Sequence, residues 1–123
     1  MKTKRRKLKD KLEKIVKKII KERDEYTCQK CGKIVQGSNC HASHIIPVSR
    51  SGRLEFDIVN IKVLCMRCHL YWYHRNPIEA AEWVKKKFPK RLEYLQERLL
   101  EPVRPIKDYE YEEMIAEFKE VND

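Results

Sequence analysis

Two Cys-x-x-Cys pairs constrain this chain more than any other feature. Cys28 and Cys31 form the first pair, and Cys65 and Cys68 form the second, with 33 residues between the pairs. A turn brings the two thiolates of each pair onto one ion, and Gly32 tolerates the strained backbone that follows the first pair. A chain of 123 residues permits one domain, and its small core needs added stabilisation from disulfides or a structural metal. The spacing therefore predicts a four-cysteine structural Zn²⁺ site in a reducing, cytoplasmic compartment.

The fifth cysteine and the hydropathy pattern narrow the class further. Cys40 lies between the two pairs, and we interpret it as a small buried hydrophobe rather than a ligand. The alternative to zinc is a set of unrelated buried thiols. No stretch approaches the roughly 20 apolar residues that span a bilayer, so we expect no membrane segment.

The positive charge is concentrated near the start of the chain. Residues 1–23 carry twelve Lys/Arg and three Asp/Glu, which accounts for the whole net charge of +9. Residues 101–123 carry eight acids and three bases. Apolar residues recur at helical spacing along the basic arm, 1–25, at Leu8, Leu12, Ile15, Val16, Ile19 and Ile20. This predicts a basic amphipathic helix that either follows a phosphate backbone or presents only a solvated face; a membrane-surface helix is a weaker third option.

The pattern divides the chain into four parts and predicts an α+β fold. After the arm, residues 26–76 should form short strands and loops that end in a helix beginning near Cys65 or Met66. Residues 77–101 should form two helices packed on this core, with Asn76 as N-cap of the first and Pro89 between them. Residues 102–123 form an acidic tail that adds one short helix or stays mobile.

A series of polar residues lies between and beside the cysteine pairs. His44, Asn60 and His69 occur in that order, and His69 directly follows Cys68. The series resembles the HNH endonuclease family, and in particular its small phage-type members, over about residues 28–73. The resemblance implies a ββα-metal core, in which a hairpin and a helix surround one divalent ion. It also implies a chain that is phage-encoded in a bacterial host.

The residue chemistry agrees with the roles that the resemblance implies. A neutral imidazole is the usual general base at neutral pH, and the resemblance gives this role to His44. Asn60 resembles the family's middle Asn, whose amide ties the loop and orients the base. Adjacent helical residues point about 100 degrees apart, so Cys68 can face zinc while His69 faces a second ion. The resemblance therefore makes His69 a ligand of the catalytic metal.

The chain departs from the family pattern at Ser43. Family members place Asp or His before the general base as a metal ligand, and Ser is a weaker one. His41 shares the face of an extended strand with Ser43, so either residue could complete a Mg²⁺ or Mn²⁺ site. His74 could also reach the ion, but an exposed helical His is the preferred interpretation.

These residues together predict metal-dependent hydrolysis of DNA phosphodiester bonds, with nicking as the default. Four basic residues near the series are candidates for phosphate contacts: Arg50, Arg53, Lys62 and Arg67. One alternative is a non-catalytic zinc module that binds nucleic acid. Another is an adaptor whose partners belong to a phage packaging or recombination complex. The sequence leaves open whether the chain forms a homodimer.

Overall fold

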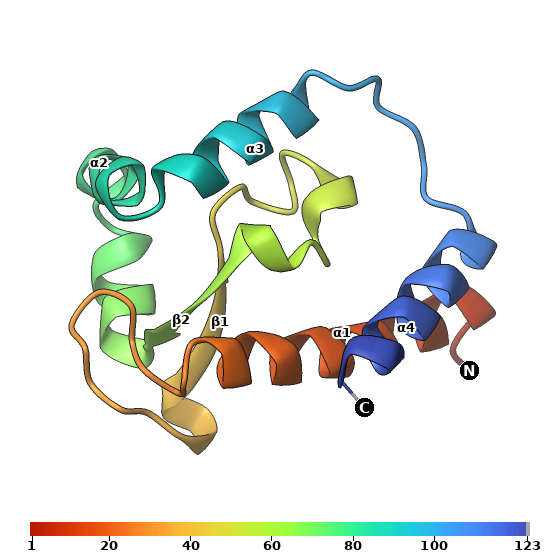
Figure 1. Cartoon of the computed structure of the whole chain (residues 1–123), viewed down its shortest axis with the longest axis horizontal. Coiled ribbons are helices and arrows are strands. Elements are labelled where there is room, and N and C mark those ends of the chain that lie inside the picture. The colour runs from red at the N-terminus through yellow and green to blue at the C-terminus, as the bar shows by residue number, and fades with distance from the viewer. Residues whose placement is uncertain (123) are drawn as a thin grey trace.

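The chain folds into helices around a small antiparallel sheet (Figure 1). The computed structural model describes residues 1–122. The longer elements are α1 (Lys4–Arg23), β1 (Cys40–His44), β2 (Ile61–Cys65), the π-helix η4 (Arg67–Tyr73), α2 (Pro77–Lys87), α3 (Pro89–Leu99) and α4 (Asp108–Asn122). Three short 3-10 helices span Gly37–Asn39, Gly52–Leu54 and Ile58–Asn60. The predicted α+β class is confirmed.

Helix α1 is the predicted basic amphipathic helix. Thr3 begins it, and its Oγ1 accepts a hydrogen bond from the Arg6 amide at 3.1 Å. Leu12, Val16 and Ile20 follow at four-residue intervals and are all buried, so one stripe of the helix faces the core.

The sheet pairs β1 with β2 from Cys40 opposite Cys65 to His44 opposite Ile61. Every residue of β2 is buried, because elements pack on both of its faces. The hydrophobic core joins the α1 stripe and both strands to residues of the C-terminal part, including Ile106, Tyr111 and Ile115. The arm, the centre and the tail therefore share one core.

Two short apolar runs of the 26–76 region, Ile34-Val35 and Ile45-Ile46, lie outside the strands. Ile45 and Ile46 follow the end of β1, and Ile34 makes a single bridge with Thr27. The sheet of the described residues therefore has two strands.

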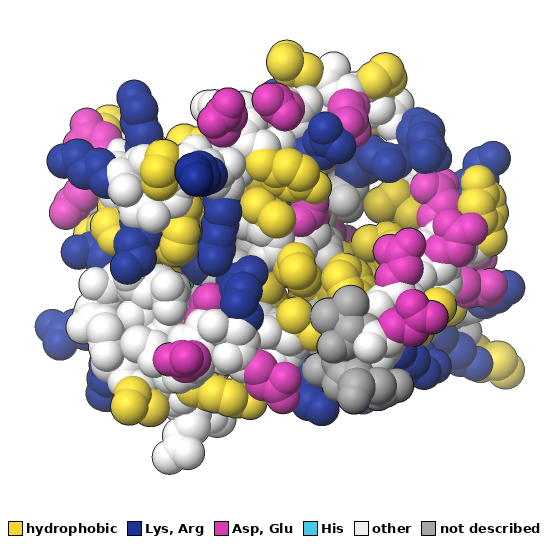
Figure 2. All heavy atoms as spheres, viewed as in Figure 1, with side chains coloured by type: hydrophobic (Ala, Val, Ile, Leu, Met, Phe, Trp, Pro, Cys, Tyr) yellow, Lys and Arg dark blue, Asp and Glu magenta, His cyan; other side chains and the backbone are white. Residues whose placement is uncertain are grey.

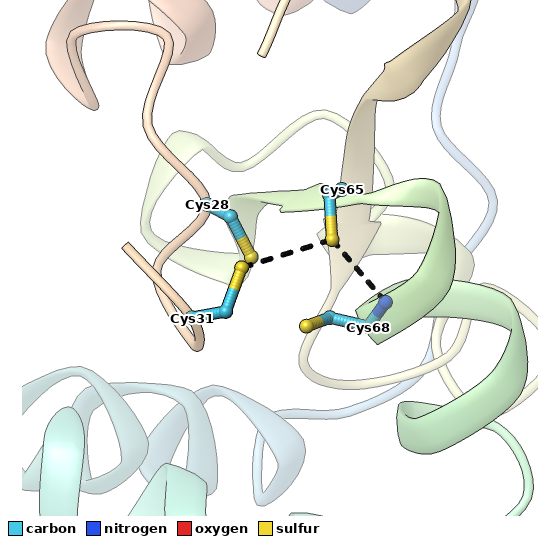
Figure 3. A group of neighbouring side chains, drawn as sticks. All are labelled: Cys28, Cys31, Cys65 and Cys68. Atoms are coloured by element: carbon cyan, nitrogen blue, oxygen red, sulfur yellow. Dashed lines mark hydrogen bonds between the residues drawn. The ribbon is translucent and has the colours of Figure 1, made fainter. Parts of the chain in front are cut away.

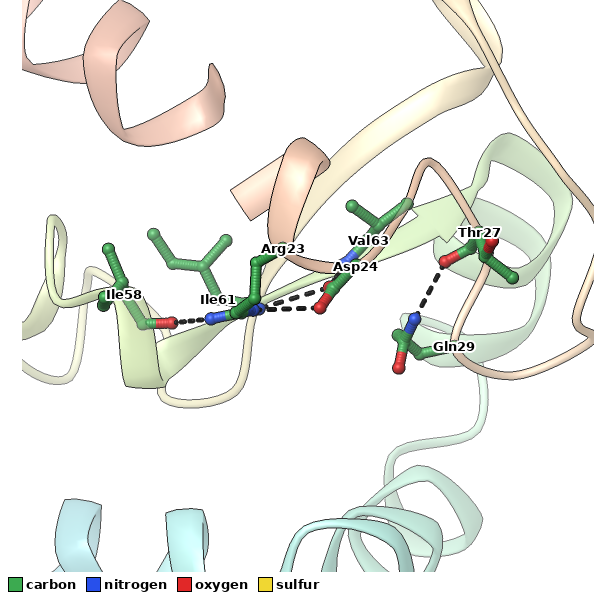
Figure 4. A network of polar contacts seen from close by, with 7 residues as sticks. All are labelled: Arg23, Asp24, Thr27, Gln29, Ile58, Ile61 and Val63. Carbon is green, nitrogen blue, oxygen red and sulfur yellow. Dashed lines mark hydrogen bonds and ion pairs between the residues drawn. The ribbon is translucent and has the colours of Figure 1, made fainter. Parts of the chain in front are cut away.

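The end of α1 is fastened to β2 by side chains (Figure 4). Arg23 donates to the carbonyl oxygens of Ile58 and Ile61, each at 2.6 Å. The neighbouring Asp24 carboxylate accepts from Arg23 Nε and from the Val63 amide, both at 2.9 Å. These bonds satisfy backbone groups of β2 and of the 3-10 helix before it, and they fix the position at which the first cysteine pair begins.

Helices α2 and α3 form the predicted pair. Pro77 begins α2, but the Asn76 side chain does not cap it and instead donates to the Trp72 carbonyl at 3.0 Å. Trp83 lies edge-on to Trp72 and to Phe88, with ring centroids 5.5 and 5.6 Å apart. This aromatic row holds α2 against the π-helix.

Helix α4 packs along α1 rather than extending as a tail. Glu112 pairs with Lys4 at 3.0 Å, and Asp108 pairs with Arg5 at 3.2 Å. Figure 2 shows acidic side chains over α4 beside basic ones at the start of α1. The acidic helix thus neutralises part of the basic arm. None of the helices in residues 1–122 is long and apolar enough to cross a membrane.

Candidate functional site

The four cysteines converge on one point, as Figure 3 shows. Their Sγ atoms all lie within 4.8 Å of one another, and those of Cys31 and Cys65 are 3.9 Å apart. Zn–S bonds of about 2.3 Å in a tetrahedron place two sulfurs about 3.8 Å apart. The cluster therefore has the donor type and the spacing of a metal site of the zinc kind, as the sequence predicted.

The backbone shapes the first half of this cluster. The Gly32 amide donates to the Cys28 carbonyl at 2.9 Å, and the Cys28 amide donates to the Lys33 carbonyl at 2.8 Å. Gly32 has φ +78°, a conformation that L side chains rarely adopt. Burial alone raises the pKa of the Cys28 thiol, but backbone amides near the sulfur outweigh it and lower the pKa to about 7. The turn thus favours a thiolate, which is the metal-binding form.

Cys40 lies outside the cluster, as predicted. Its side chain is buried in the hydrophobic core, opposite Cys65 across the sheet. Burial raises the pKa of its thiol. Cys40 is therefore a neutral packing residue.

Asn60 ties together the loop that follows β1. It is 0 % exposed, and its Oδ1 accepts from the Ile46 amide at 2.7 Å. Its Nδ2 donates to the carbonyl oxygens of Ile46 and Leu54, both at 3.0 Å. All the polar atoms of this amide are used inside the protein, so Asn60 holds the backbone rather than reaching for a ligand.

The same loop orients His44. Its Nε2 lies 2.8 Å from the Glu55 carbonyl oxygen. A carbonyl can only accept, so Nε2 carries the proton of the neutral ring and Nδ1 keeps a lone pair. The chain thereby selects one tautomer of the half-buried His44.

A row of three histidines runs beside His44. His41 Nε2 donates to the Ser38 carbonyl at 2.9 Å, so in the neutral ring its Nδ1 accepts. That Nδ1 lies 3.0 Å from His69 Nδ1, which must therefore carry the proton. Burial, and then the nearby His74 and His41, lower the pKa of His69 to about 4, so its ring is neutral at pH 7. His69 Nε2 therefore carries a lone pair, which it can direct to a donor or to an ion.

His74 joins this row because the intervening helix is a π-helix. His69 Nε2 and His74 Nε2 are 3.0 Å apart, and the His74 amide donates to the His69 carbonyl at 3.2 Å. In a π-helix, residues five apart lie on one face, whereas α-helical geometry separates them. The sequence interpretation of His74 as an exposed helical residue missed this pairing, and the five-residue spacing was the available signal.

Ser43 and Lys62 do not take the positions that were expected of them. Ser43 is 1 % exposed, and its Oγ accepts a hydrogen bond from Lys62 Nζ at 3.1 Å. The Ser43 hydroxyl is thus bonded inside the protein. Lys62 is 0 % exposed, so its side chain lies in the interior and not on the surface where a DNA contact was predicted.

Lys62 has an unusual environment for a charged residue. Its Nζ lies 3.8 Å from the centre of the Tyr73 ring and near the carbonyl oxygens of Ser43 and His44. No carboxylate of the described residues pairs with it. Burial, and to a smaller extent the Arg91 charge, lower the pKa of Lys62 to about 7. The charged form of Lys62 thus lowers the stability of the folded state relative to the neutral amine.

The remaining basic candidates stay at the surface. Arg50 and Arg67 are exposed, and Arg53 is partly exposed. Two lysines of α1 that the sequence did not single out, Lys17 and Lys21, line a hollow of about 260 Å³ together with His41 and His69. Basic side chains therefore border the histidine row.

The histidines open onto a groove of about 800 Å³ between β1, the π-helix and the α2–α3 pair. His44, His69 and His74 all line it, while α2 and α3 provide a largely apolar wall that includes Ala80, Val84 and Leu92. A concave site with a few converging polar groups is the usual form of a ligand or active site.

These features define a small α+β protein in which a four-cysteine cluster positioned to bind a metal ion lies beside a histidine-lined groove. The family model described as Bacteriophage Lambda NinG protein matches residues 1–121, and the chain belongs to that family. The sequence analysis predicted a phage-encoded protein, and the match to a phage protein family agrees with that prediction. No curated protein and no solved structure matches the chain.

Proposed function

We propose that the chain is a metal-dependent endonuclease of the HNH type that hydrolyses DNA phosphodiester bonds by nicking. The observation that carries the proposal is the groove in which an oriented His44 lies beside the His69–His74 pair. The order β1, β2 and π-helix supports a ββα-metal core, since a hairpin and a following helix carry these residues.

The His69–His74 pair fits a divalent ion. Ligand bonds of about 2.0–2.1 Å place two imidazole nitrogens roughly 3 Å apart, and the two Nε2 atoms are 3.0 Å apart. No acidic side chain of the described residues completes a three-ligand group with them. Affinity for imidazole donors rises from Mn²⁺ to Ni²⁺ and Zn²⁺, and Mg²⁺ prefers oxygen ligands, so the pair favours Ni²⁺ or Zn²⁺ over Mn²⁺ and Mg²⁺. Such an ion would stabilise charge on the phosphoryl group.

His41 is a positioning residue in this proposal, not a ligand. It accepts the Nδ1 proton of His69 and is itself anchored on the Ser38 carbonyl. A partner of this kind fixes the tautomer of a ligating His and directs its other nitrogen to the ion.

His44 is the proposed general base. The Glu55 carbonyl holds its Nε2 proton, so Nδ1 can take a proton from a water molecule that attacks the phosphate. Asn60 keeps the loop that supplies this carbonyl in place, through its bond to Leu54.

The four-cysteine cluster is proposed to hold a structural Zn²⁺. Cys65 is the last residue of β2, and Cys68 lies in the π-helix directly before His69. The metal would therefore fix the start of the helix that carries the histidine pair.

Nicking of supercoiled plasmid tests the proposal. We expect activity in Ni²⁺ or Zn²⁺, and a loss of about 10²- to 10⁴-fold in His44→Ala. His41→Ala should raise the metal concentration required by about 10- to 100-fold, and His74→Ala by more. Tyr71→Ala is the matched control, because Tyr71 is an exposed residue of the same π-helix outside the groove.

All variants must retain the metal of the cysteine cluster, measured by metal analysis. Nicking that survives in His44→Ala would contradict the proposed base. If wild type and variant both bind DNA and neither cuts in any metal, the non-catalytic binding module becomes the better description. The basic α1 helix would then be its main contact.

A further inference from the structure

A second pocket lies beyond the loop that follows β1. It has a volume of about 460 Å³ and is formed by that loop, the end of α3, the linker to α4 and the first turns of α1. In Figure 1 the linker from α3 to α4 runs around this loop. Among residues 1–122, only Val48 lines both this pocket and the histidine groove, so the loop separates the two.

The pocket is rich in basic side chains. Two acidic residues, Glu55 and Glu101, line it against five basic ones: Lys9, Arg50, Arg53, Arg98 and Arg104. This arginine pocket therefore has an excess of positive charge.

The ion pairs leave part of that charge uncompensated. Glu55 pairs with Lys9 at 3.2 Å, and Glu101 pairs with Arg98 at 3.0 Å. Arg104 makes a bidentate pair with Glu110 of α4, at 2.8 and 3.1 Å. Within the described residues, Arg50 and Arg53 have no carboxylate partner. Two guanidinium groups are thus available to an external anion.

The loop that carries these arginines is held by its own backbone. The amides of Arg50 and Ser51 both donate to the Pro47 carbonyl, at 2.9 and 3.2 Å. Arg53 Nη1 lies 3.5 Å from the Arg104 carbonyl on the facing linker. The two sides of the pocket are therefore in contact, and its basic groups are partly organised before any ligand arrives.

One residue connects the pocket to the proposed general base. The Glu55 carboxylate faces Lys9 at the pocket, while the Glu55 carbonyl holds His44 Nε2. The segment that forms the pocket wall is thus the one that orients His44.

We propose that the arginine pocket binds a backbone phosphate of the DNA strand, at a position separate from the phosphate at the histidine groove. Guanidinium groups recognise phosphate oxygens in a bidentate fashion, and a converging set of them suits one phosphate group. The inference rests on the proposed nuclease function and adds Arg98 to its DNA contacts, since the Arg98–Glu101 pair is exposed at the pocket and a phosphate can replace the carboxylate. The pocket would hold the strand while His44 acts across the loop.

The test measures binding of a labelled DNA duplex by fluorescence anisotropy, without divalent ions, over a range of salt concentrations. Loss of one phosphate contact reduces the slope of log K against log salt by about 1. We expect this reduction in Arg50→Gln and in Arg98→Gln. Lys86→Gln is the matched control, because Lys86 is exposed on α2 and lines neither pocket.

Further variants separate the charge from the fold. Arg98→Lys keeps the charge and should keep the slope, and every variant should retain the wild-type thermal midpoint. Slopes of Arg50→Gln and Arg98→Gln that equal that of Lys86→Gln would overturn the inference. Inorganic phosphate provides a second test of the ligand, through its effect on the thermal midpoint. If it raises the midpoint of wild type but not that of Arg98→Gln, while the DNA-binding slopes of the two proteins are equal, the pocket binds a free anion and the assignment to backbone phosphate is wrong.

Failure of this inference is distinguishable from failure of the proposed function. Binding is measured without cleavage, and His44→Ala should bind with the wild-type slope. If wild type nicks DNA and the pocket variants keep their slopes, only the pocket assignment is wrong. If His44→Ala still nicks, the catalytic proposal is wrong and the slopes still decide the pocket.

Discussion

Replacing the buried Lys62 with methionine should stabilise the protein in a pH-dependent way. A pKa that falls from 10.5 to about 7 on folding corresponds to about 5 kcal/mol against folding below pH 7. Between these pH values the unfolded chain binds more protons than the folded chain, so wild-type stability rises with pH. Lys62→Met removes this titration. Its stability relative to wild type should therefore be greatest near pH 7 and should fall by about 2 kcal/mol by pH 9.

Urea unfolding of both proteins at the two pH values measures this change. Losing the bond to Ser43 Oγ and the contact with the Tyr73 ring adds a cost. The part of these contacts that needs the charged amine titrates with Lys62 and is contained in its pKa shift, and the remainder does not depend on pH, so the difference between the two pH values isolates the buried charge. Lys86→Met, at an exposed lysine, is the control and should show no such change. A Lys62→Met effect that is equal at both pH values would refute the reasoning.

Three other predictions test separate parts of the structure. Cys28→Ser should lose the cluster metal and cooperative unfolding, measured by metal analysis and circular dichroism, whereas Cys40→Ser should keep both. Asn60→Ala should lower the free energy of unfolding by about 2–4 kcal/mol in urea titrations, because three hydrogen bonds to buried backbone are lost. Glu112→Gln should free Lys4 and steepen the salt dependence of DNA binding by about one unit of slope; an unchanged slope would show that α4 does not compete with DNA.

The helices and the cysteine cluster could be predicted because their signals are local. Apolar spacing marks α1, Pro77 and Pro89 mark the starts of α2 and α3, and the two Cys-x-x-Cys turns bring their own ligands together. In each case the residues that decide the structure lie within a few positions of one another.

The site geometry could not be predicted to the same extent because it depends on packing. Lys62 interrupts the otherwise apolar run of β2, a pattern typical of a strand covered on both faces, but its charge pointed to the surface, and only the packing shows that its side chain is buried. His74 pairs with His69 only because the helix takes a π turn, which propensity does not indicate. Asn76 is of a residue type that commonly caps helices, yet its side chain donates to the Trp72 carbonyl instead of capping α2.

The π-helix also has a consequence for insertions and deletions. Removing one residue, for example the exposed Tyr71, would let the segment return to an α-helix in which the two histidines are four apart and still share a face. The histidine pair itself does not require the extra residue. The extra residue is required instead for the direction in which the chain continues toward α2, because one residue turns an α-helix by about 100 degrees. The wide π turn therefore places α2 where it forms one wall of the groove. A one-residue deletion should preserve the histidine pair but move α2 away from the groove.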